Sequence, residues 1–332
     1  MANCKYYFVT IKDNYFKYTR SIEHFKNDNL FQHLKITTEE FINFLKKIQY
    51  TGTLTKILYY VENFKDANKI IKFSDNLSPW IKIFYVAFHD WWCNPGLEIS
   101  NPEVYFYNLN AFKYSRIRYI ACTDYKTLGF FLNKNLEEYK KNIISWDLHN
   151  CYDNCIVRLN NNPINKILVS GCISSVAYPE RFKIVNFNNV YLKEIDNNTK
   201  WSNEKAYSQY LNQYICCFSS SVYPHNLTTN KHEYGHIILL KTYEILGSGS
   251  LLLSPLDQKN KLAKIGLIED INCMFVDMSN DKKIQEKIDF ILNKKNRNFI
   301  DNIRKNGQNY GINNLSSKKK YEMLKKLIIN SE

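Results

Sequence analysis

The sequence predicts an α/β protein of two doubly wound domains, each a mostly parallel sheet with helices on both faces. Short apolar runs recur along the chain, and helical patterns separate them. The chain has 332 residues, which is enough for two domains of ordinary size, each with its own core. A polar stretch at residues 160–165 (NNNPIN) interrupts the pattern, so we expect domains at residues 1–160 and 161–332.

In the first domain we expect one early helix and several buried strands. Residues 36–40 (ITTEE), followed by Phe41, Phe44 and Leu45, have the pattern of a capped amphipathic helix. The rest of the first fifty residues indicates no clear element. Beyond residue 80, apolar runs predict three strands, with a helical stretch between the second and the third. The strands are expected at residues 80–88, 117–122 and 142–146, and the helix at residues 126–139.

In the second domain strands and helices alternate more regularly. Buried strands are expected at residues 166–170, 214–219, 250–254 and 273–277. Helices are expected near residues 204–212, 237–246, 258–265 and 282–292, and two more around Phe299 and Tyr321. In a doubly wound domain the ligand lies at the carboxyl ends of the strands, so functional residues are expected just after them.

The formal net charge of +13 raises the question of a nucleic-acid partner, because lysine and arginine displace the counterions of a phosphate backbone. Lysine is spread along the whole chain, however. The densest basic stretch, residues 318–326, has apolar Leu324, Leu327 and Ile328 at helical spacing, which is typical of the solvated face of a terminal helix. We therefore expect no nucleic-acid partner. The positive charge would still favour an anionic small molecule such as a nucleotide diphosphate.

Two further features concern the cellular compartment. No run of about 18 apolar residues occurs, and the N-terminal residues carry charges where a signal peptide needs its apolar stretch. The nine cysteines are an odd number, and several lie inside apolar runs, which is typical of reduced, buried thiols. We therefore expect a cytoplasmic protein without a transmembrane segment.

Residues 232–236 (HEYGH) fit the pattern H-E-x-x-H, in which two histidines bind zinc and the glutamate between them acts as a base. This interpretation would make the chain a zinc metallopeptidase. The extended metal pattern asks for glycine where the chain has Leu239 and for histidine where it has Thr242. Glu244 is also too close to the second histidine for the usual distant glutamate ligand. We keep the peptidase as an alternative.

The same segment allows a second interpretation, in which a helix starts near Gly235 and carries Lys241 and Glu244 one turn apart. The run Gly247-Ser248-Gly249 and a buried strand at residues 250–254 follow. This arrangement resembles the C-terminal domain of GT-B glycosyltransferases, particularly the group-1 and CgeB-like enzymes. Further segments that resemble this family lie at residues 166–171, 178–181, 266–272 and 303–307.

The resemblance covers about residues 160–330, and the first half of the chain matches only in its general pattern. It implies the GT-B architecture, two Rossmann-like domains that face each other across a cleft. It also implies a hexosyltransferase-like enzyme that moves a sugar from a UDP- or GDP-sugar donor to an acceptor hydroxyl. The acceptor, a glycan or another hydroxyl compound, would be held by the first domain. No metal and no other cofactor is expected, since helix dipoles and side-chain cations would stabilise the leaving diphosphate.

A nucleotide-sugar donor presents a ribose diol and a diphosphate with about two negative charges, so its site needs a carboxylate together with cations or helix N-termini. By resemblance, Glu244 is the ribose-binding residue. Lys241 and Arg181 are the candidates for the phosphates, and arginine can bind phosphate through two hydrogen bonds. The other donor-binding candidates are Gly171, Ser220, Tyr223, His236, Gly247, Ser248 and Gly249.

An inverting enzyme of this architecture would take its base from the first domain. His89 and Asp90 follow an expected strand, and a neighbouring carboxylate can orient or charge an imidazole, so they are the catalytic candidates. Asp147 and His149 follow another strand and leave a third alternative open. GT-A glycosyltransferases hold a metal with Asp-x-Asp or occasionally Asp-x-His, so this pair would indicate a metal-dependent enzyme. No Asp-x-Asp occurs in the chain, and the C-terminal pattern has no place in that fold.

Overall fold

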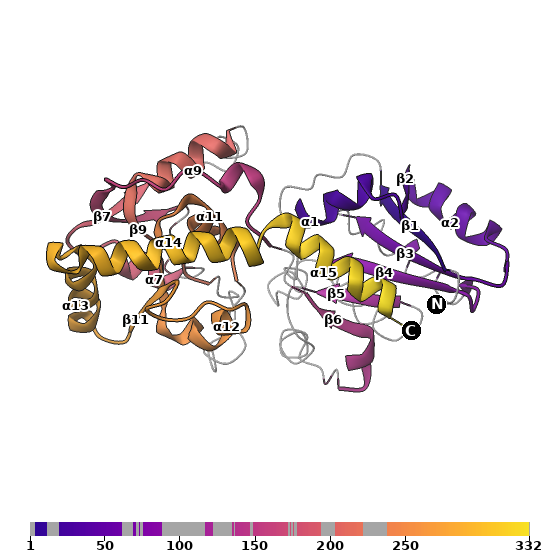
Figure 1. The fold of residues 1–332 in the computed structure, drawn as a ribbon. Helices are drawn as coiled ribbons and strands as arrows, with labels where there is room; N and C mark the ends of the chain where they lie inside the picture. The colour runs from indigo at the N-terminus through magenta and orange to yellow at the C-terminus, as the bar shows by residue number, and fades with distance from the viewer. Residues whose placement is uncertain are drawn as a thin grey trace. The chain divides into compact units, whose positions relative to one another are not determined.

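The fold is given by a computed structural model, in which the chain divides into two α/β units. The structure describes residues 4–11, 20–61, 69–70, 73, 76–87, 117–121, 135, 137–146, 149–171, 173, 175, 178–193, 203–221 and 238–331. One unit consists of Met1–Leu148 with Tyr321–Glu332, and the other of His149–Lys320. Each unit has its own parallel sheet (Figure 1), so the predicted α/β class with two doubly wound sheets is confirmed.

The division between the units differs from the expected one in two places. Residues 149–160 belong to the second unit, and the amide of Cys151 donates to the carbonyl of Leu315 over 2.8 Å. Residues 321–332 belong to the first unit, because the last helix contributes apolar side chains to the core of that unit. Of the polar run at residues 160–165, residues 160–163 therefore lie in a loop inside the second unit, and residues 164–165 begin its first strand.

The first unit is built on a six-stranded sheet of order β2-β1-β3-β4-β5-β6, in which all paired neighbours are parallel. Its second strand in sequence lies on one side of β1 and its third on the other, which is a doubly wound order. The elements are β1 (Cys4–Ile11), α1 (Arg20–Glu23), η1 (His24–Asn27), β2 (Gln32–Ile36), α2 (Thr38–Lys47), β3 (Leu54–Val61), β4 (Ile81–Ala87), β5 (Ile117–Ala121), η4 (Glu137–Asn142) and β6 (Ile143–Ser145).

The expected early helix and the three expected strands of this unit are confirmed. Thr37 and Glu40 form a capping box at the start of α2. The Glu40 amide donates to Thr37 Oγ1 over 3.2 Å, and the Thr37 amide donates to Glu40 Oε2 over 2.7 Å. Strands β1, β2 and β3 were not predicted, because polar residues, such as Lys56 in β3, interrupt their apolar runs. Of the helix expected at residues 126–139, the structure describes residue 135, which lies outside any helix, and residues 137–139, which belong to the 3₁₀ helix η4.

The last helix, α15 (Ser317–Asn330), is a structural part of the first unit. Its residues Leu324 and Ile328 are fully buried in a cluster with Phe8 of β1 and Leu58 of β3. Burial of an apolar side chain of this size contributes about 1.5–3 kcal/mol. The chain therefore closes the core of its first unit with residues from its C-terminal end.

Lys56 of β3 holds the C-terminal end of α15. Its side chain is buried, and Nζ donates to the carbonyls of Ile328 at 3.1 Å and Ile329 at 2.8 Å, and to that of Ser331. We expect Lys56→Met to lower the free energy of unfolding by about 1–3 kcal/mol, because the last helical carbonyls lose a charged donor. Urea denaturation measures this loss. The control Lys5→Met, at an exposed position of β1, should lose less than about 0.5 kcal/mol, and equal losses would contradict the role of Lys56.

The second unit is built on a five-stranded parallel sheet of order β11-β10-β9-β7-β8. All four strands and all six helices expected after residue 160 are confirmed, and the edge strand β8 is additional. The elements are η5 (Asp153–Cys155), β7 (Ile164–Ser170), α7 (Pro179–Ile184), β8 (Val190–Lys193), α9 (Glu204–Asn212), β9 (Tyr214–Phe218), α11 (Leu240–Ser248), β10 (Leu251–Pro255), η6 (Leu256–Gln258), α12 (Lys259–Lys264), β11 (Met274–Val276), α13 (Asp281–Leu292), η7 (Lys294–Asn296) and α14 (Arg297–Asn314).

Helices cover both faces of this second sheet. The chain moves in one direction from β7 to β8 and in the other from β8 to β9, so right-handed crossovers place α7 and α9 on opposite faces. Figure 1 shows α9 and α7 on the two sides of the sheet. Helix α11 continues in the direction of α9, contacts it, and therefore shares its face.

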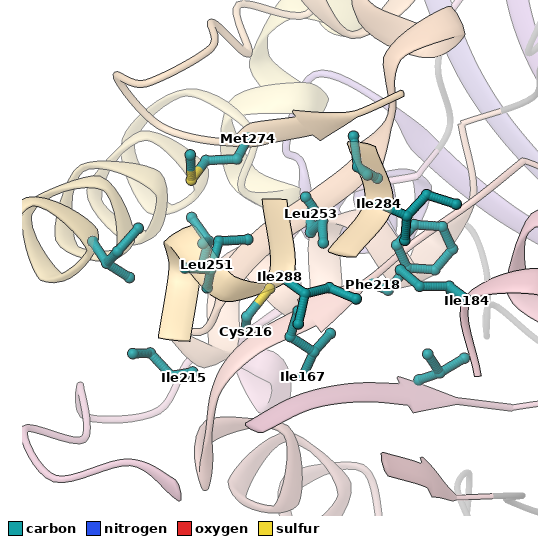
Figure 2. Packing of buried hydrophobic residues seen from close by; sticks show 14 of the residues in the cluster. Ile167, Ile184, Ile215, Cys216, Phe218, Leu251, Leu253, Met274, Ile284 and Ile288 are labelled. Atoms are coloured by element: carbon teal, nitrogen blue, oxygen red, sulfur yellow. The ribbon is translucent and has the colours of Figure 1, made fainter. Parts of the chain in front are cut away.

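The core of the second unit lies between the sheet and α13. Figure 2 shows Ile167 of β7, Phe218 of β9 and Leu253 of β10 packed near Ile284 and Ile288 of α13. Strands β9 and β10 are buried along their whole length, as their continuous apolar runs predict for central strands. Over the described part of the chain, no helix is both long and apolar enough to cross a membrane.

Candidate functional site

The strand order of the second sheet reverses between β7 and β9, so the carboxyl ends of these two strands mark its topological switch point. From β7 the chain goes to β8 on one side and returns to β9 on the other. In doubly wound sheets, ligands bind in the crevice at such a switch point. At the end of β7 lie Ser170, its last residue, and Gly171. Ser219, Ser220 and Ser221 follow β9.

Helix α11 begins beside these two strand ends. The hydroxyls of Thr242 and Ser219 lie 3.1 Å apart, and Lys241 Nζ donates to Ser170 Oγ over 3.0 Å. Both contacts involve the first turn of the helix, whose amides and dipole favour an anion. Lys241, which the sequence analysis predicts to bind phosphate, therefore lies at the switch point.

The Lys241 ammonium group is held by aromatic and polar neighbours. Its Nζ lies 4.4 Å from the centre of the Tyr207 ring, and the Tyr207 hydroxyl lies 3.0 Å from Ser170 Oγ. Glu244 supplies a carboxylate, with Lys241 Nζ and Glu244 Oε2 3.8 Å apart. Because Lys241 is only 9% exposed, these neighbours replace much of the water that would otherwise solvate its charge.

Glu244 lies one turn further along α11 and is completely buried. Its Oε1 accepts a hydrogen bond of 3.0 Å from the hydroxyl of Tyr152. Burial, and then the charge of Glu244, raise the pKa of Tyr152, so the phenol keeps its proton and acts as the donor. The structure thus brings together the lysine and the carboxylate that the sequence places one turn apart. Tyr152 was missed, because it precedes the expected domain boundary and no motif marks it.

Arg181 of α7 lies beside the end of β7. It is 4% exposed, and its guanidinium carbon lies 4.2 Å from the centre of the Tyr178 ring. Gly171 has a φ of +100°, and a Cβ placed on it would lie 3.7 Å from the Arg181 Nη1 atom. Arg181 and Lys241 are therefore next to consecutive residues at the end of β7, and the two cations favour an anionic ligand there.

The hydroxyls of Ser220 and Ser221 add polar atoms after β9. Each serine is 1% exposed, and within the described ranges neither Oγ has a hydrogen-bond partner. Buried hydroxyls are nearly always hydrogen-bonded, so these two groups offer hydrogen-bonding capacity to a polar ligand at this strand end. Ser220 was among the predicted donor-binding residues.

A pocket of about 560 Å³ lies at the same edge of the sheet, on the face covered by α7. Its walls include Pro179 and Lys183 of α7, Leu256 after β10 and Asp277 after β11. This volume is within the range of about 300–1,000 Å³ that is usual for small-molecule sites. The carboxyl edge of the second sheet is therefore hollowed on the face covered by α7, and the walls of this hollow carry three carboxylates, Glu180, Asp257 and Asp277, beside one lysine.

Gly247, Ser248 and Gly249 do not lie at this edge, contrary to the prediction that they bind a donor. They end α11 just before β10 begins, at the amino edge of the sheet, and the nine-residue helix is about 13 Å long. Gly249 has a φ of 77° and ends the helix in the left-handed conformation. A Cβ on Gly247 would lie 2.5 Å from Cys155 Sγ. The two glycines are required for helix termination and close packing.

Several predicted residues lie outside the described part of the chain. They are the catalytic candidates His89 and Asp90, the donor-binding candidates Tyr223 and His236, Asp147, and the segment at residues 232–236. His149 is described and buried, with its ring centre 6.4 Å from that of Tyr243. Among the residues that the structure describes, no group of three or more His, Cys, Asp or Glu side chains could hold a metal ion. The catalytic pair and the metal-binding alternatives stay predictions.

Comparison with solved structures identifies the fold, whereas sequence comparison does not. No protein-family model and no curated protein sequence matches this chain. Alr3699/HepE of Anabaena, in complex with UDP-glucose, is similar over 98% of this chain and 100% of its own, with a TM-score of 0.57 and 6% identity. A glycosyltransferase from Rickettsia africae ESF-5 is similar over 99% of this chain and 100% of its own, with a TM-score of 0.52 and 9% identity.

A third similar structure is that of Staphylococcus aureus TarM, a mutant form in complex with fondaparinux, α-GlcNAc-glycerol and UDP. It aligns with 83% of this chain and 55% of its own, with a TM-score of 0.50 and 12% identity. Likeness at these identities concerns the fold, and it extends over both units of this chain. The chain has the GT-B glycosyltransferase fold, as its sequence predicts.

Proposed function

We propose that this chain is a glycosyltransferase whose second unit binds a nucleotide-sugar donor and whose first unit binds an acceptor with a hydroxyl group. The observation that carries the proposal is the pair Lys241 and Glu244 at the switch point of the second sheet. A cation and a buried carboxylate lie one helical turn apart. The cation matches the diphosphate of a nucleotide diphosphate, and the carboxylate matches its ribose diol. The complexes of Anabaena HepE with UDP-glucose, and with UDP and glucose, support a UDP-sugar as the donor.

Each part of the proposed donor has a matching group in the second unit. The Glu244 carboxylate accepts hydrogen bonds from the ribose hydroxyls. Lys241, Arg181 and the first turn of α11 bind the diphosphate, with Gly171 and Ser220 at the adjoining strand ends. Negative charge grows on the diphosphate as the sugar leaves, and cations already held in place stabilise that charge in the transition state. The proposed chemistry needs no metal ion.

The acceptor side of the reaction is proposed from the sequence. A glycan or another hydroxyl compound is the proposed acceptor. His89 is the proposed base that removes the proton of its hydroxyl, and Asp90 orients the imidazole. A base of this kind is required if the reaction inverts the configuration of the sugar.

Calorimetric titration of the full chain with UDP- and GDP-sugars, with and without EDTA, tests the proposal. We expect one nucleotide series to bind equally well in both conditions. Binding only in the presence of a divalent metal would instead favour a GT-A type enzyme that uses Asp147 and His149. Stoichiometric zinc without nucleotide affinity would favour the peptidase at residues 232–236. Release of free nucleotide in the presence of an acceptor distinguishes an enzyme from a binding protein.

Arg181→Ala is expected to weaken the binding of the nucleoside diphosphate by about tenfold, because a charge-assisted hydrogen bond to phosphate is lost. The affinity for the nucleoside without phosphates should stay the same. Calorimetry with both ligands measures the difference. Lys205→Ala, at an exposed position of α9, removes the same charge away from the switch point and is the control. Equal weakening by both variants would mean that only the overall charge matters.

A further inference from the structure

We propose that Tyr152 is the positioning residue of the nucleotide site, and that its hydroxyl holds the Glu244 carboxylate in the orientation that receives the ribose. This inference rests on the proposed function of the site and assigns a role to a residue outside the sequence pattern that led to that function. It makes the segment before β7 part of the donor-binding machinery.

The contact between the two side chains is buried. Tyr152 is 3% exposed and Glu244 is 0% exposed, and the Tyr152 hydroxyl lies 3.0 Å from Glu244 Oε1. The other oxygen, Oε2, faces Lys241 Nζ at 3.8 Å. The carboxylate therefore has a neutral donor at one oxygen and a cation near the other, and the two contacts restrict how the group can turn.

The segment that carries Tyr152 is itself fixed to the second unit. The amide of Cys151 donates to the carbonyl of Leu315 over 2.8 Å, and Cys151 Sγ donates to the carbonyl of Tyr243 over 3.2 Å. On the other side of Tyr152, the side-chain amide of Asn154 donates to Glu204 Oε2 over 2.9 Å. These contacts join the segment to Leu315, which caps the C-terminal end of α14, and to helices α11 and α9, so the phenol has a defined place next to α11.

The chemical consequence follows from the number of hydrogen bonds that a carboxylate accepts. An ionised carboxylate has about four acceptor positions, and the Tyr152 hydroxyl uses one of them. A ribose diol needs two. Without the phenol, Oε1 loses this donor and the Glu244 carboxylate can turn further toward Lys241. Tyr152 therefore governs how well the site distinguishes a ribose diol from a sugar that lacks one hydroxyl.

The test compares UDP with 2′-deoxy-UDP, or GDP with 2′-deoxy-GDP if the guanine nucleotide binds. We expect the wild-type chain to bind the ribonucleotide about tenfold more tightly than the deoxyribonucleotide, because a hydrogen bond to a charged group is lost. In Tyr152→Phe the ratio should fall to about two- to threefold. The affinity for the deoxyribonucleotide should change less than about twofold. A role that is merely structural would weaken both ligands equally and leave the ratio at its wild-type value, and that result would overturn the inference.

A matched control and a second variant complete the experiment. Tyr310→Phe removes another hydroxyl from the same unit, one that donates to the carbonyl of Ile265 over 3.0 Å, and it should keep the wild-type ratio. In a double-mutant cycle, Tyr152→Phe should have no further effect on the ratio once Glu244→Gln is present. Additive effects would overturn the inference. A wild-type chain that binds neither nucleotide would overturn the proposed function itself, whereas nucleotide binding with an unchanged ratio in Tyr152→Phe overturns only the role of Tyr152.

Discussion

Glu244→Gln should weaken the binding of the nucleoside diphosphate by about 10- to 100-fold, the largest loss of affinity that we expect from a single change. The substitution keeps the size of the side chain and removes its charge. Hydrogen bonds to a charged group contribute about 1.5–3 kcal/mol, and each 1.4 kcal/mol corresponds to about tenfold in affinity. The ribose hydroxyls would lose an ionised acceptor. Calorimetry measures the loss of affinity.

The control for this substitution is Glu286→Gln, which makes the same chemical change on α13, where the side chain is 62% exposed. It should leave the affinity unchanged. Thermal unfolding of both variants separates a loss of binding from a loss of stability. An affinity of Glu244→Gln equal to that of the wild type would remove this residue from the site, and with it the principal support for the proposed function.

Gly247→Val should lower the free energy of unfolding of the second unit by about 3 kcal/mol, because new atoms are forced into a filled space. A Cβ at this position would lie 2.5 Å from Cys155 Sγ and 2.9 Å from the Cys155 carbonyl oxygen. The sulfur belongs to a buried side chain and the oxygen to the backbone, so neither moves without disturbing the segment next to α11. Urea denaturation followed by circular dichroism measures the loss.

Two control variants test whether the loss of stability in Gly247→Val comes from the contact with Cys155. Lys305→Val introduces the same side chain at an exposed position of the long helix α14, and it should cost less than about 1 kcal/mol, mostly through helix propensity. Cys155→Ala combined with Gly247→Val removes the sulfur and should restore part of the lost stability. If Gly247→Val alone has a small effect and Cys155→Ala restores no stability, helix α11 can move away from the segment that contains Cys155.

The strands in the second half of the chain were predictable because the main ones lie in the middle of their sheet. Strands β9 and β10 are buried on both faces, so their sequences are continuous apolar runs that stand out from the helices between them. In the first half, β3 is also central, yet it contains Lys56, whose charge is satisfied by carbonyls of the last helix. A local pattern gives no sign of a partner about 270 residues away, and this strand was therefore missed.

The candidate site was partly predictable for a similar reason. Lys241 and Glu244 lie on one helix, and the helical period alone places them one turn apart. Gly247 and Gly249 are also close to them in sequence, but the length of α11 carries them to the opposite edge of the sheet. Side chains on one helix lie next to each other only when they are three or four positions apart.

The sequence by itself determined the α/β class, the alternation of elements after residue 160 and the pairing of Lys241 with Glu244, because all of these depend on short-range periodicity. Only the tertiary structure decided that Tyr152 meets Glu244, that residues 149–160 belong to the second unit and that the last helix completes the first. Those features are contacts between segments distant in sequence. They form only when apolar surfaces are buried together, and no local pattern of residues encodes them.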